Sequence, residues 1–338
     1  MNAPVNQAPA LIDKHGRHID YVRLSVTDRC DFRCVYCMSE KMTFLPRDQV
    51  LTLEEIHQVA RAFTRLGVKK IRLTGGEPLV RKNVLDLVQN IGALPGLEEL
   101  LITTNGSHLE QMAPALKAAG VTRINISVDS LNRDTFRQMT RTGDLDQVLR
   151  GIEAARAQCF KTLRLNAVIL KGRNDHEILD LLHYAMALGI NIAYIEEMPL
   201  GEVSDHDRLE TTCSNDELRA VIEARHQLTP VTMKTAGPSR YYRIEGSDSR
   251  VGFISPVSHN FCESCNRVRL TCTGTLYMCL GQEDMADLRA PLRASADDAA
   301  LHTAIRAAIA RKPKGHDFDY SRQGVAGQMT RHMSHTGG

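Results

Sequence analysis

Short apolar runs alternate with amphipathic stretches between Tyr21 and Met198, and this alternation most constrains the fold of the 338-residue chain. Six runs read as buried strands: VRLSVT, KKIRLTGGEP, LLITTNG, RINISVDS, LRLNAVIL and NIAYIEEM. Helical patterns separate them, and the first of these opens with a predicted capping box, Thr52 and Glu55. Strands divided by helices favour a parallel sheet, so we expect an α/β fold with an incomplete, TIM-like (β/α)6 barrel.

The alternation fades after Pro199, which divides the chain into parts of different character. Further barrel helices are predicted near residues 83–91, 109–119, 145–158 and 175–188. Beyond the barrel we predict a helix at 215–223, short strands near Arg240 and Val251, and a helix at 297–310. The predicted divisions are a mobile N-terminal segment (1–20), the barrel (21–200), a C-terminal α+β extension (201–310) and a mobile tail (311–338).

The charge balance excludes several classes of partner. Charged residues make up 24% of the chain and nearly cancel to a formal +2, so no global field indicates nucleic acid or an anionic membrane. No segment approaches the roughly 20 consecutive apolar residues of a membrane span, and the first ten residues lack a secretory pattern. We therefore expect a soluble, cytoplasmic protein that binds neither nucleic acid nor membrane.

Six of the nine cysteines fall into two close groups, which in a reducing compartment indicate metal or redox ligands. The first group, Cys30, Cys34 and Cys37, lies in the loop after the first predicted strand. Three thiolates can hold three corners of an iron–sulfur cubane and leave one iron open for a substrate. A zinc site completed by His57 and a thioredoxin-like CxxC are the alternatives.

The CxxxCxxC spacing in this loop, with Tyr36 before the last cysteine, resembles the radical S-adenosylmethionine (SAM) superfamily. The resemblance implies a [4Fe–4S] cluster whose free iron binds the amino and carboxylate groups of SAM and whose electron cleaves SAM to a 5′-deoxyadenosyl radical. It also implies SAM contacts at Tyr36, Gly76, Ser127 and Met198. Glycine in the TGGEP string would permit the close approach of a ligand to the backbone.

The second group, Cys262, Cys265 and Cys279, again offers three thiolates. A structural zinc site completed by Cys272 or His259 is the alternative to a second cluster with a free iron. If residues 266–279 form a hairpin that turns at Thr273-Gly274, strand parity places Cys272 on the face opposite to Arg267 and Arg269. Cys272 is then the weaker candidate ligand, and the two arginines suit an anionic ligand with purine or phosphate edges. Cys159 and Cys213 are expected to be inert packing residues.

The whole pattern, CNRVRLTCTGTLYMCL included, resembles the GTP 3′,8-cyclase family of molybdenum cofactor biosynthesis from about Asp20 to the end of the chain. The resemblance implies that the second [4Fe–4S] cluster binds the guanine of GTP. Arg164 stands where the family usually has lysine, and we expect the triphosphate contact to be retained. The terminal glycines, Gly337 and Gly338, match a family tail that enters the active site. The implied GTP contacts are Arg23, Arg72, Thr103, Arg164, Arg267, Val268 and Arg269.

The resemblance also implies a lyase reaction and its partners. The 5′-deoxyadenosyl radical would remove the hydrogen from C3′ of GTP, and the C3′ radical would attack C8 of guanine. The product would be 3′,8-cyclo-7,8-dihydro-GTP, the first intermediate of molybdopterin synthesis, taken next by cyclic pyranopterin monophosphate synthase. An external electron donor is required, and the protein is expected to be a monomer or homodimer.

Three other interpretations remain open from the sequence. A radical enzyme that modifies a peptide would share the first cysteine motif, although such enzymes tend to use more cysteines for their auxiliary clusters. A binding module organised by zinc would share the cysteines without catalysis, and a phosphate-binding regulator would share the polar loops that follow the strands.

Overall fold

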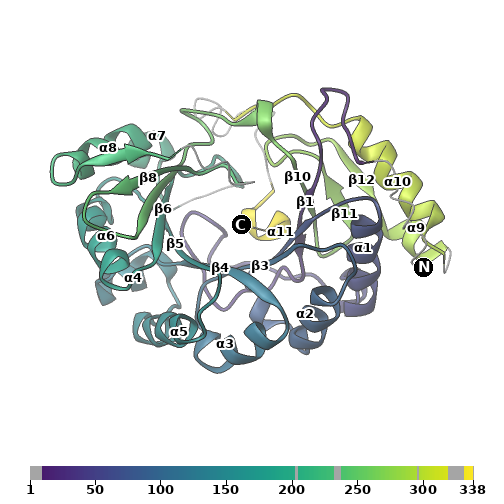
Figure 1. The fold of residues 1–338 in the computed structure, drawn as a ribbon, viewed down its shortest axis with the longest axis horizontal. Helices are drawn as coiled ribbons and strands as arrows, with labels where there is room; N and C mark the ends of the chain where they lie inside the picture. Colours follow the sequence, from purple (N-terminus) through teal and green to yellow (C-terminus); the bar gives the residue numbers. More distant parts are fainter. Residues whose placement is uncertain (1–9, 202–204, 232–236, 295–296, 319–330, 338) are drawn as a thin grey trace, which may run out of the picture.

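The computed structural model describes residues 10–201, 205–231, 237–294, 297–318 and 331–337, whose strands form one sheet curved into an open barrel (Figure 1). The spatial order is β12-β11-β10-β1-β2-β3-β4-β5-β6-β9-β8-β7. The barrel strands are β1 (Tyr21–Ser25), β2 (Lys70–Thr74), β3 (Glu99–Thr104), β4 (Val121–Ser127), β5 (Thr162–Val168) and β6 (Asn191–Ile195). The remaining strands are β7 (Leu228–Pro230), β8 (Arg240–Ile244), β9 (Arg250–Ile254), β10 (Arg267–Leu270), β11 (Thr275–Tyr277) and β12 (Met285–Asp287).

The six barrel strands pair in parallel, as the alternation predicts. The extension adds one parallel strand at each side, because β10 pairs with β1 and β9 pairs with β6. Each added strand continues into antiparallel neighbours, β11 and β12 on one side and β8 and β7 on the other. The expected incomplete barrel with a C-terminal α+β extension is confirmed.

Helices cover the outer face of the sheet (Figure 1). Thr52 and Glu55 form the predicted capping box at the start of α1. Helix α4 was not predicted, because its eight residues are too short to show a clear period. The helices are α1 (Leu53–Arg65), α2 (Val84–Gly92), α3 (Leu109–Ala118), α4 (Arg133–Thr140), α5 (Leu145–Ala157), α6 (Ile178–Ala187), α7 (Arg208–Thr211), α8 (Asn215–Glu223), α9 (Arg289–Ala294), α10 (Ala299–Ala310) and α11 (Met333–Thr336).

Strand parity makes the barrel apolar outside and cationic inside. Val22 and Leu24 of β1 are fully buried in the hydrophobic core. Arg23 lies between them and lines the interior cavity instead. The parallel register pairs Arg23 with Arg72 of β2 on one side and with Arg269 of β10 on the other. Three arginines on adjacent strands therefore lie side by side, an arrangement that favours a bound anion.

The start of the chain packs differently from the expectation of a mobile segment 1–20. Leu11 and Ile19 are buried, and Ile12 bridges to His18. Arg17, held by Asp13, donates hydrogen bonds to the carbonyl oxygens of residues in the extension and the tail. Residues 10–20 thus form part of the fold, whereas residues 1–9 lie outside the described residues.

The end of the chain returns to the middle of the barrel. Helix α11 lies within the ring of strands, far from the outer helices (Figure 1). Within the described ranges, no helix has both the length and the apolar character needed to cross a membrane.

Candidate active site

The first three cysteines share one pocket at the carboxyl ends of the barrel strands. The loop after β1 carries Cys30, Cys34 and Cys37, all half-buried, into this pocket. The four residues expected to contact SAM line the same pocket: Tyr36, Gly76, Ser127 and Met198. The structure therefore brings together residues from β1 to β6 that lie far apart in the sequence.

Two glycines after β2 allow the cysteine loop to cross the backbone closely. A Cβ atom at Gly76 would lie 2.3 Å from the carbonyl oxygen of Arg29, and one at Gly75 would lie 2.6 Å from that of Thr27. The amide of Gly76 donates to the carbonyl oxygen of Thr27 at 2.8 Å. Any side chain here would displace the cysteine loop, so this site requires glycine.

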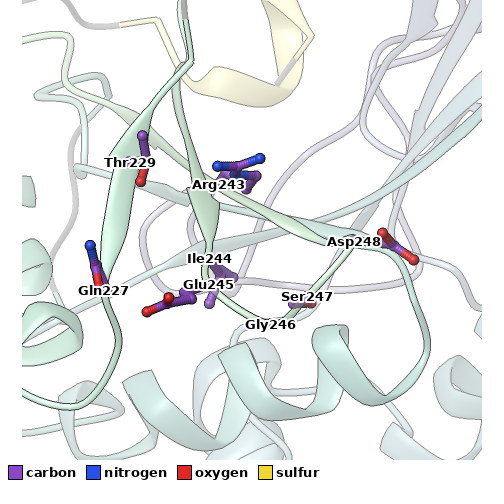
Figure 2. Close-up of a pocket in the computed structure, with 8 residues that line it drawn as sticks. All are labelled: Gln227, Thr229, Arg243, Ile244, Glu245, Gly246, Ser247 and Asp248. Atoms are coloured by element: carbon purple, nitrogen blue, oxygen red, sulfur yellow. The ribbon is translucent and has the colours of Figure 1, made fainter.

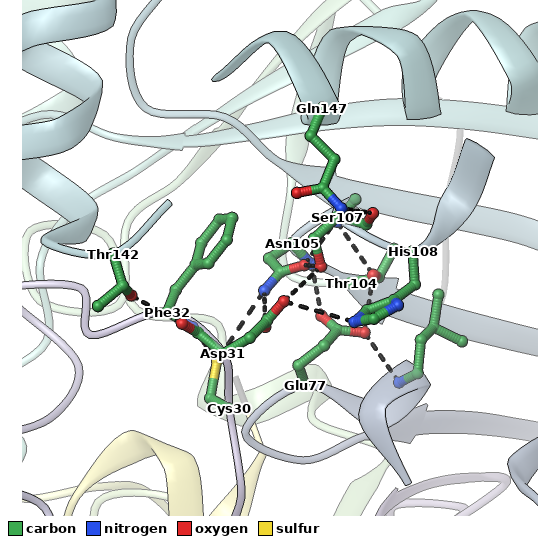
Figure 3. A network of polar contacts seen from close by, with 12 residues as sticks. Cys30, Asp31, Phe32, Glu77, Thr104, Asn105, Ser107, His108, Thr142 and Gln147 are labelled. Carbon is green, nitrogen blue, oxygen red and sulfur yellow. Dashed lines mark hydrogen bonds and ion pairs between the residues drawn. The ribbon is translucent and has the colours of Figure 1, made fainter. Parts of the chain in front are cut away.

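A buried carboxylate fixes the loops around Cys30 (Figure 3). Glu77 accepts hydrogen bonds from the Thr104 hydroxyl at 2.8 Å and from the Asn105 amide at 2.6 Å. The side chain of Asn105 in turn donates to Asp31, next to Cys30, at 2.6 Å. Burial raises the pKa of Glu77 to about 8. Sequence reasoning missed this network, although Glu77 belongs to the TGGEP string.

Asp129, also missed by sequence reasoning, anchors the cysteine loop to the barrel. The Tyr36 hydroxyl donates to one carboxylate oxygen of Asp129 at 2.7 Å, and the amide of Val168 donates to the other at 2.9 Å. Burial raises the pKa of Asp129 to about 6. The loop after β1 is thus tied to the ends of β4 and β5, which positions the pocket wall.

A cationic chamber adjoins this pocket inside the barrel. Arg72 donates from Nε to the Tyr21 hydroxyl at 2.5 Å and from Nη1 to the Thr103 hydroxyl at 3.2 Å. Arg164 donates from Nη1 to the Tyr241 hydroxyl at 2.6 Å. Two tyrosines, neither predicted from the sequence, therefore orient two of the expected GTP contacts. The expected contacts that line the chamber are Arg23, Arg72, Thr103, Arg164, Arg267 and Arg269.

Val268 is placed differently from the other expected GTP contacts. Its side chain is 1% exposed and packs in the hydrophobic core, because parity turns it away from Arg267 and Arg269. Only its backbone is therefore suited to contact a ligand in the chamber.

The other three grouped cysteines, Cys262, Cys265 and Cys279, line a further pocket beside β10. The predicted hairpin is present, since β10 and β11 pair with a turn closed by a bond from Gly274 to Thr271. Cys272 is buried and accepts a hydrogen bond from Leu51 at its carbonyl oxygen. Among the described residues that line this pocket, Cys272 does not appear, so the placement agrees with strand parity.

The three pockets form one continuous site. Met198 lines all of them, Thr103 and Asn166 line both the first pocket and the chamber, and Arg267 and Arg269 line both the chamber and the second cysteine pocket. The cationic chamber thus lies between the two groups of three thiolates. This geometry suits an anionic substrate placed between two metal centres.

The tail reaches this continuous site. Met333 of α11 lines the first cysteine pocket. Arg269 donates a hydrogen bond to the carbonyl oxygen of Gly337. A Cβ atom at Gly337 would lie 2.0 Å from the Thr74 hydroxyl, and its φ of +75° favours glycine. Gly338, the other expected tail residue, lies outside the described residues.

The donor sets fit polynuclear clusters better than single ions. Within the part of the chain that the structure describes, no three His, Cys, Asp or Glu side chains are placed to hold one metal ion. Each pocket nevertheless collects three soft sulfur donors, and the Phe32 amide donates to the Cys30 sulfur at 3.4 Å. Thiolates that surround a shared space and accept amide hydrogen bonds are typical of iron–sulfur sites.

One cysteine of each group shows how the nearby charges differ, while burial raises the pKa of both Cys262 and Cys279. At the first group, burial and the carboxylates Glu77 and Asp31 raise the pKa of Cys30. At the second, burial alone would raise the pKa of Cys265, but Arg267 and Lys312 outweigh it and lower the pKa to about 7.

A separate pocket lies around the β8–β9 turn, in the part of the extension that does not carry the cysteines (Figure 2). Its polar side chains, among them Arg243, Glu245 and Asp248, are exposed and come from a single hairpin and its neighbour β7. None of the expected site residues lines it, so it is not part of the continuous site.

Comparisons with known proteins identify the relatives of this chain. Residues 24–185 match the family model of the radical SAM superfamily, and residues 190–318 match that of Molybdenum Cofactor Synthesis C. The GTP 3′,8-cyclase of Paracoccus denitrificans (strain Pd 1222) is 54% identical over 97% of this chain and 96% of its own length. GTP 3′,8-cyclase 2 of Pseudomonas aeruginosa (strain PAO1) is 56% identical over 97% of this chain and 98% of its own length.

Among solved structures, Streptococcus suis SuiB bound to S-adenosylmethionine is similar in fold, with a TM-score of 0.60 and 15% identity over 87% of this chain and 69% of that one. The near full-length identity to curated cyclases and the two family matches agree with the resemblance noted in the sequence. The chain belongs to the GTP 3′,8-cyclase family of the radical SAM superfamily.

Proposed function

We propose that this chain is a GTP 3′,8-cyclase, which joins C3′ of the ribose of GTP to C8 of its guanine in the first step of molybdenum cofactor biosynthesis. One observation carries the proposal: a chamber lined by arginines on adjacent strands joins two pockets that each hold three thiolates. A nucleoside triphosphate has the charge for the chamber, and its guanine has the nitrogen and oxygen donors for a free iron at the second pocket.

The two pockets would hold the cofactors of this reaction. Cys30, Cys34 and Cys37 would bind one [4Fe–4S] cluster, and Cys262, Cys265 and Cys279 would bind the other. Bound at the first group, the cluster supplies the electron that cleaves SAM. Gly76 would offer its backbone to the methionyl end of SAM, and Tyr36, Ser127 and Met198 line the same pocket.

The chain's own residues would mainly position and neutralise the substrate. Arg23, Arg72 and Arg164 come from three different strands and suit the triphosphate, while Arg267 and Arg269, which also line the second cysteine pocket, would contact the guanine. The Arg164 guanidinium, fixed by Tyr241, supplies the cation that lysine usually supplies in the family. Holding both reactants in one continuous cavity would favour the reaction between them by fixing their positions.

The remaining partner assignments follow from this reaction. An external donor would supply electrons, and cyclic pyranopterin monophosphate synthase would consume the product. A cytoplasmic location supplies both GTP and a reducing environment for the cysteines.

The test is an anaerobic incubation of the reconstituted protein with SAM and GTP deuterated at C3′. The product is an isomer of GTP, so chromatographic separation must precede mass analysis. We expect a new nucleotide and deuterium transferred into 5′-deoxyadenosine. Formation of 5′-deoxyadenosine that carries no deuterium would contradict the proposed reaction, and so would 5′-deoxyadenosine formed without a new nucleotide. Protein that lacks the first cysteine group serves as the blank.

A further inference from the structure

A buried lysine lies under the second cysteine group. Lys312, which follows α10, is only 1% exposed. Its ammonium donates to the carbonyl oxygens of Arg267, at 2.9 Å, and of Met278, and it lies 3.7 Å from the sulfur of Cys265. An ammonium has three protons to donate, so these three acceptors use all of them.

Backbone contacts hold this lysine in place. Arg17 donates to the carbonyl oxygens of Cys262, Pro313 and Lys314 at 2.5 to 2.9 Å. The guanidinium of Arg17 is itself held by Asp13 at 2.6 Å. The segment that carries Lys312 is therefore clamped to the cysteine loop, and its ammonium cannot swing into solvent without breaking these bonds.

The charge of Lys312 acts on the thiols of the second cysteine group. Among its hydrogen-bond acceptors in the described ranges, the one that can carry a negative charge is the Cys265 sulfur, and its charge also favours the thiolates of Cys262 and Cys279. Burying an unpaired ammonium costs several kcal/mol. The pocket therefore stabilises negative charge at Cys265 and at whatever that sulfur binds.

The first cysteine group has the opposite design. Asp31 lies beside Cys30, with its carboxylate 3.9 Å from the sulfur, and the buried carboxylates of Glu77 and Asp129 line the same pocket. Reduction adds negative charge to a cluster, so cations near its ligands raise the reduction potential and anions lower it.

We propose that Lys312 is a positioning residue that holds the second cluster at a higher reduction potential than the first. The inference rests on the proposed function in one respect, that both cysteine groups carry clusters. Its consequence is that a first electron reduces the second cluster, at the GTP end of the cavity. The first cluster, at the SAM end, is reduced only by a stronger donor.

The test is a redox titration of the full-length, anaerobically reconstituted protein, followed by electron paramagnetic resonance. Replacing Cys30, Cys34 and Cys37 with alanine leaves only the second cluster's signal. In this background Lys312→Met, which keeps the length of the side chain without its charge, should lower the midpoint potential. Lys312→Arg should keep it, and Lys314→Met, which removes an exposed charge two residues away, should leave it unchanged.

Each outcome decides the inference. An unchanged midpoint in Lys312→Met with normal iron content would overturn it. If Lys312→Met binds no iron at the second cysteine group, a role for the charge predicts that Lys312→Gln also binds none and that Lys312→Arg retains its cluster. Loss of iron in all three variants would overturn the inference. Wild-type protein with iron for only one cluster would instead remove the proposed function, which separates the two failures.

Discussion

Hydroxyl groups hold the cationic side chains of the chamber in place. Tyr21 accepts from Arg72, and Tyr241 accepts from Arg164, whose Nε also donates to the side chain of Asn166, so both guanidinium groups are fixed in orientation. Burial and Arg267 lower the pKa of Arg269 to about 9. An empty chamber therefore carries strongly repelling cations, and an anionic substrate relieves that repulsion.

Tyr21 should titrate far below an ordinary tyrosine. Burial alone would raise its pKa, but Arg72, Arg23 and Arg267 outweigh burial and lower the pKa to about 7. Since the unfolded pKa is about 10, the phenolate's stabilisation is complete above pH 10 and is lost as pH falls through about 7. Ultraviolet titration of the protein should show one tyrosinate with a midpoint near 7, and bound GTP should raise that midpoint.

Two variants identify the group responsible. Tyr21→Phe should remove the absorbance step near pH 7. Tyr184→Phe should leave that step intact, because burial raises the pKa of this half-buried tyrosine. The assignment fails if the step survives in Tyr21→Phe.

The cysteines make separable contributions. Cys34→Ala should abolish 5′-deoxyadenosine formation and reduce bound iron to about half, because two protein thiolates cannot hold the first cluster well. Cys272→Ala should retain both clusters, since that buried side chain lies apart from the second cysteine pocket. Iron and sulfide analysis with a deoxyadenosine assay measures both effects, and loss of the second cluster in Cys272→Ala would show that strand parity misplaced this residue.

At the scale of single elements, the start of α1 depends on a reciprocal cap. Thr52 accepts from the Glu55 amide at 3.2 Å, and Glu55 accepts from the Thr52 amide at 2.8 Å. Thr52→Ala should lower the free energy of unfolding by about 1 kcal/mol, and Thr52→Ser should restore most of it. Denaturant unfolding measures the difference, and equal stability of the alanine and serine variants would exclude the side-chain cap as its source.

The elements with a strong local period were predictable from the sequence. The strand of each βα unit, and helices such as α8 and α10, follow from hydrophobic spacing that does not depend on the rest of the fold. Short elements such as α4, β7 and β12 were missed, because three to eight residues give too little period and tertiary pairing decides them.

The site was predictable only where spacing carries chemistry. The short spacing of the cysteines predicted metal ligands, and strand parity predicted that Arg267 and Arg269 share one face. Asp129 and Lys312 gave no such signal, because they act on Tyr36 and Cys265, 93 and 47 residues away. Such contacts exist only once the barrel has closed.

At the scale of the whole molecule, both ends of the described chain close on the cavity. Arg17 clamps the segment behind the second cysteine group, and α11 enters the ring of strands and lines the first (Figure 1). The sheet is not closed into a full barrel, and these contacts bring both ends of the described chain to the cavity. The catalytic space is thus completed by segments that are remote in sequence from the cysteine loop.

The tail contact can be tested at Gly337. Gly337→Ala places a methyl group against the Thr74 hydroxyl in a left-handed backbone, a strain of about 1–3 kcal/mol that should displace the end of the tail. Turnover of GTP should fall by roughly five- to 150-fold, while iron content and thermal unfolding stay unchanged because only the last residues move. Gly246→Ala is the matched control, since its φ is +74° but no atom lies within 4 Å of the added carbon and the turn is remote from the cavity. Equal turnover in the two variants would mean that the seated tail is dispensable and that the strands alone shield the reaction.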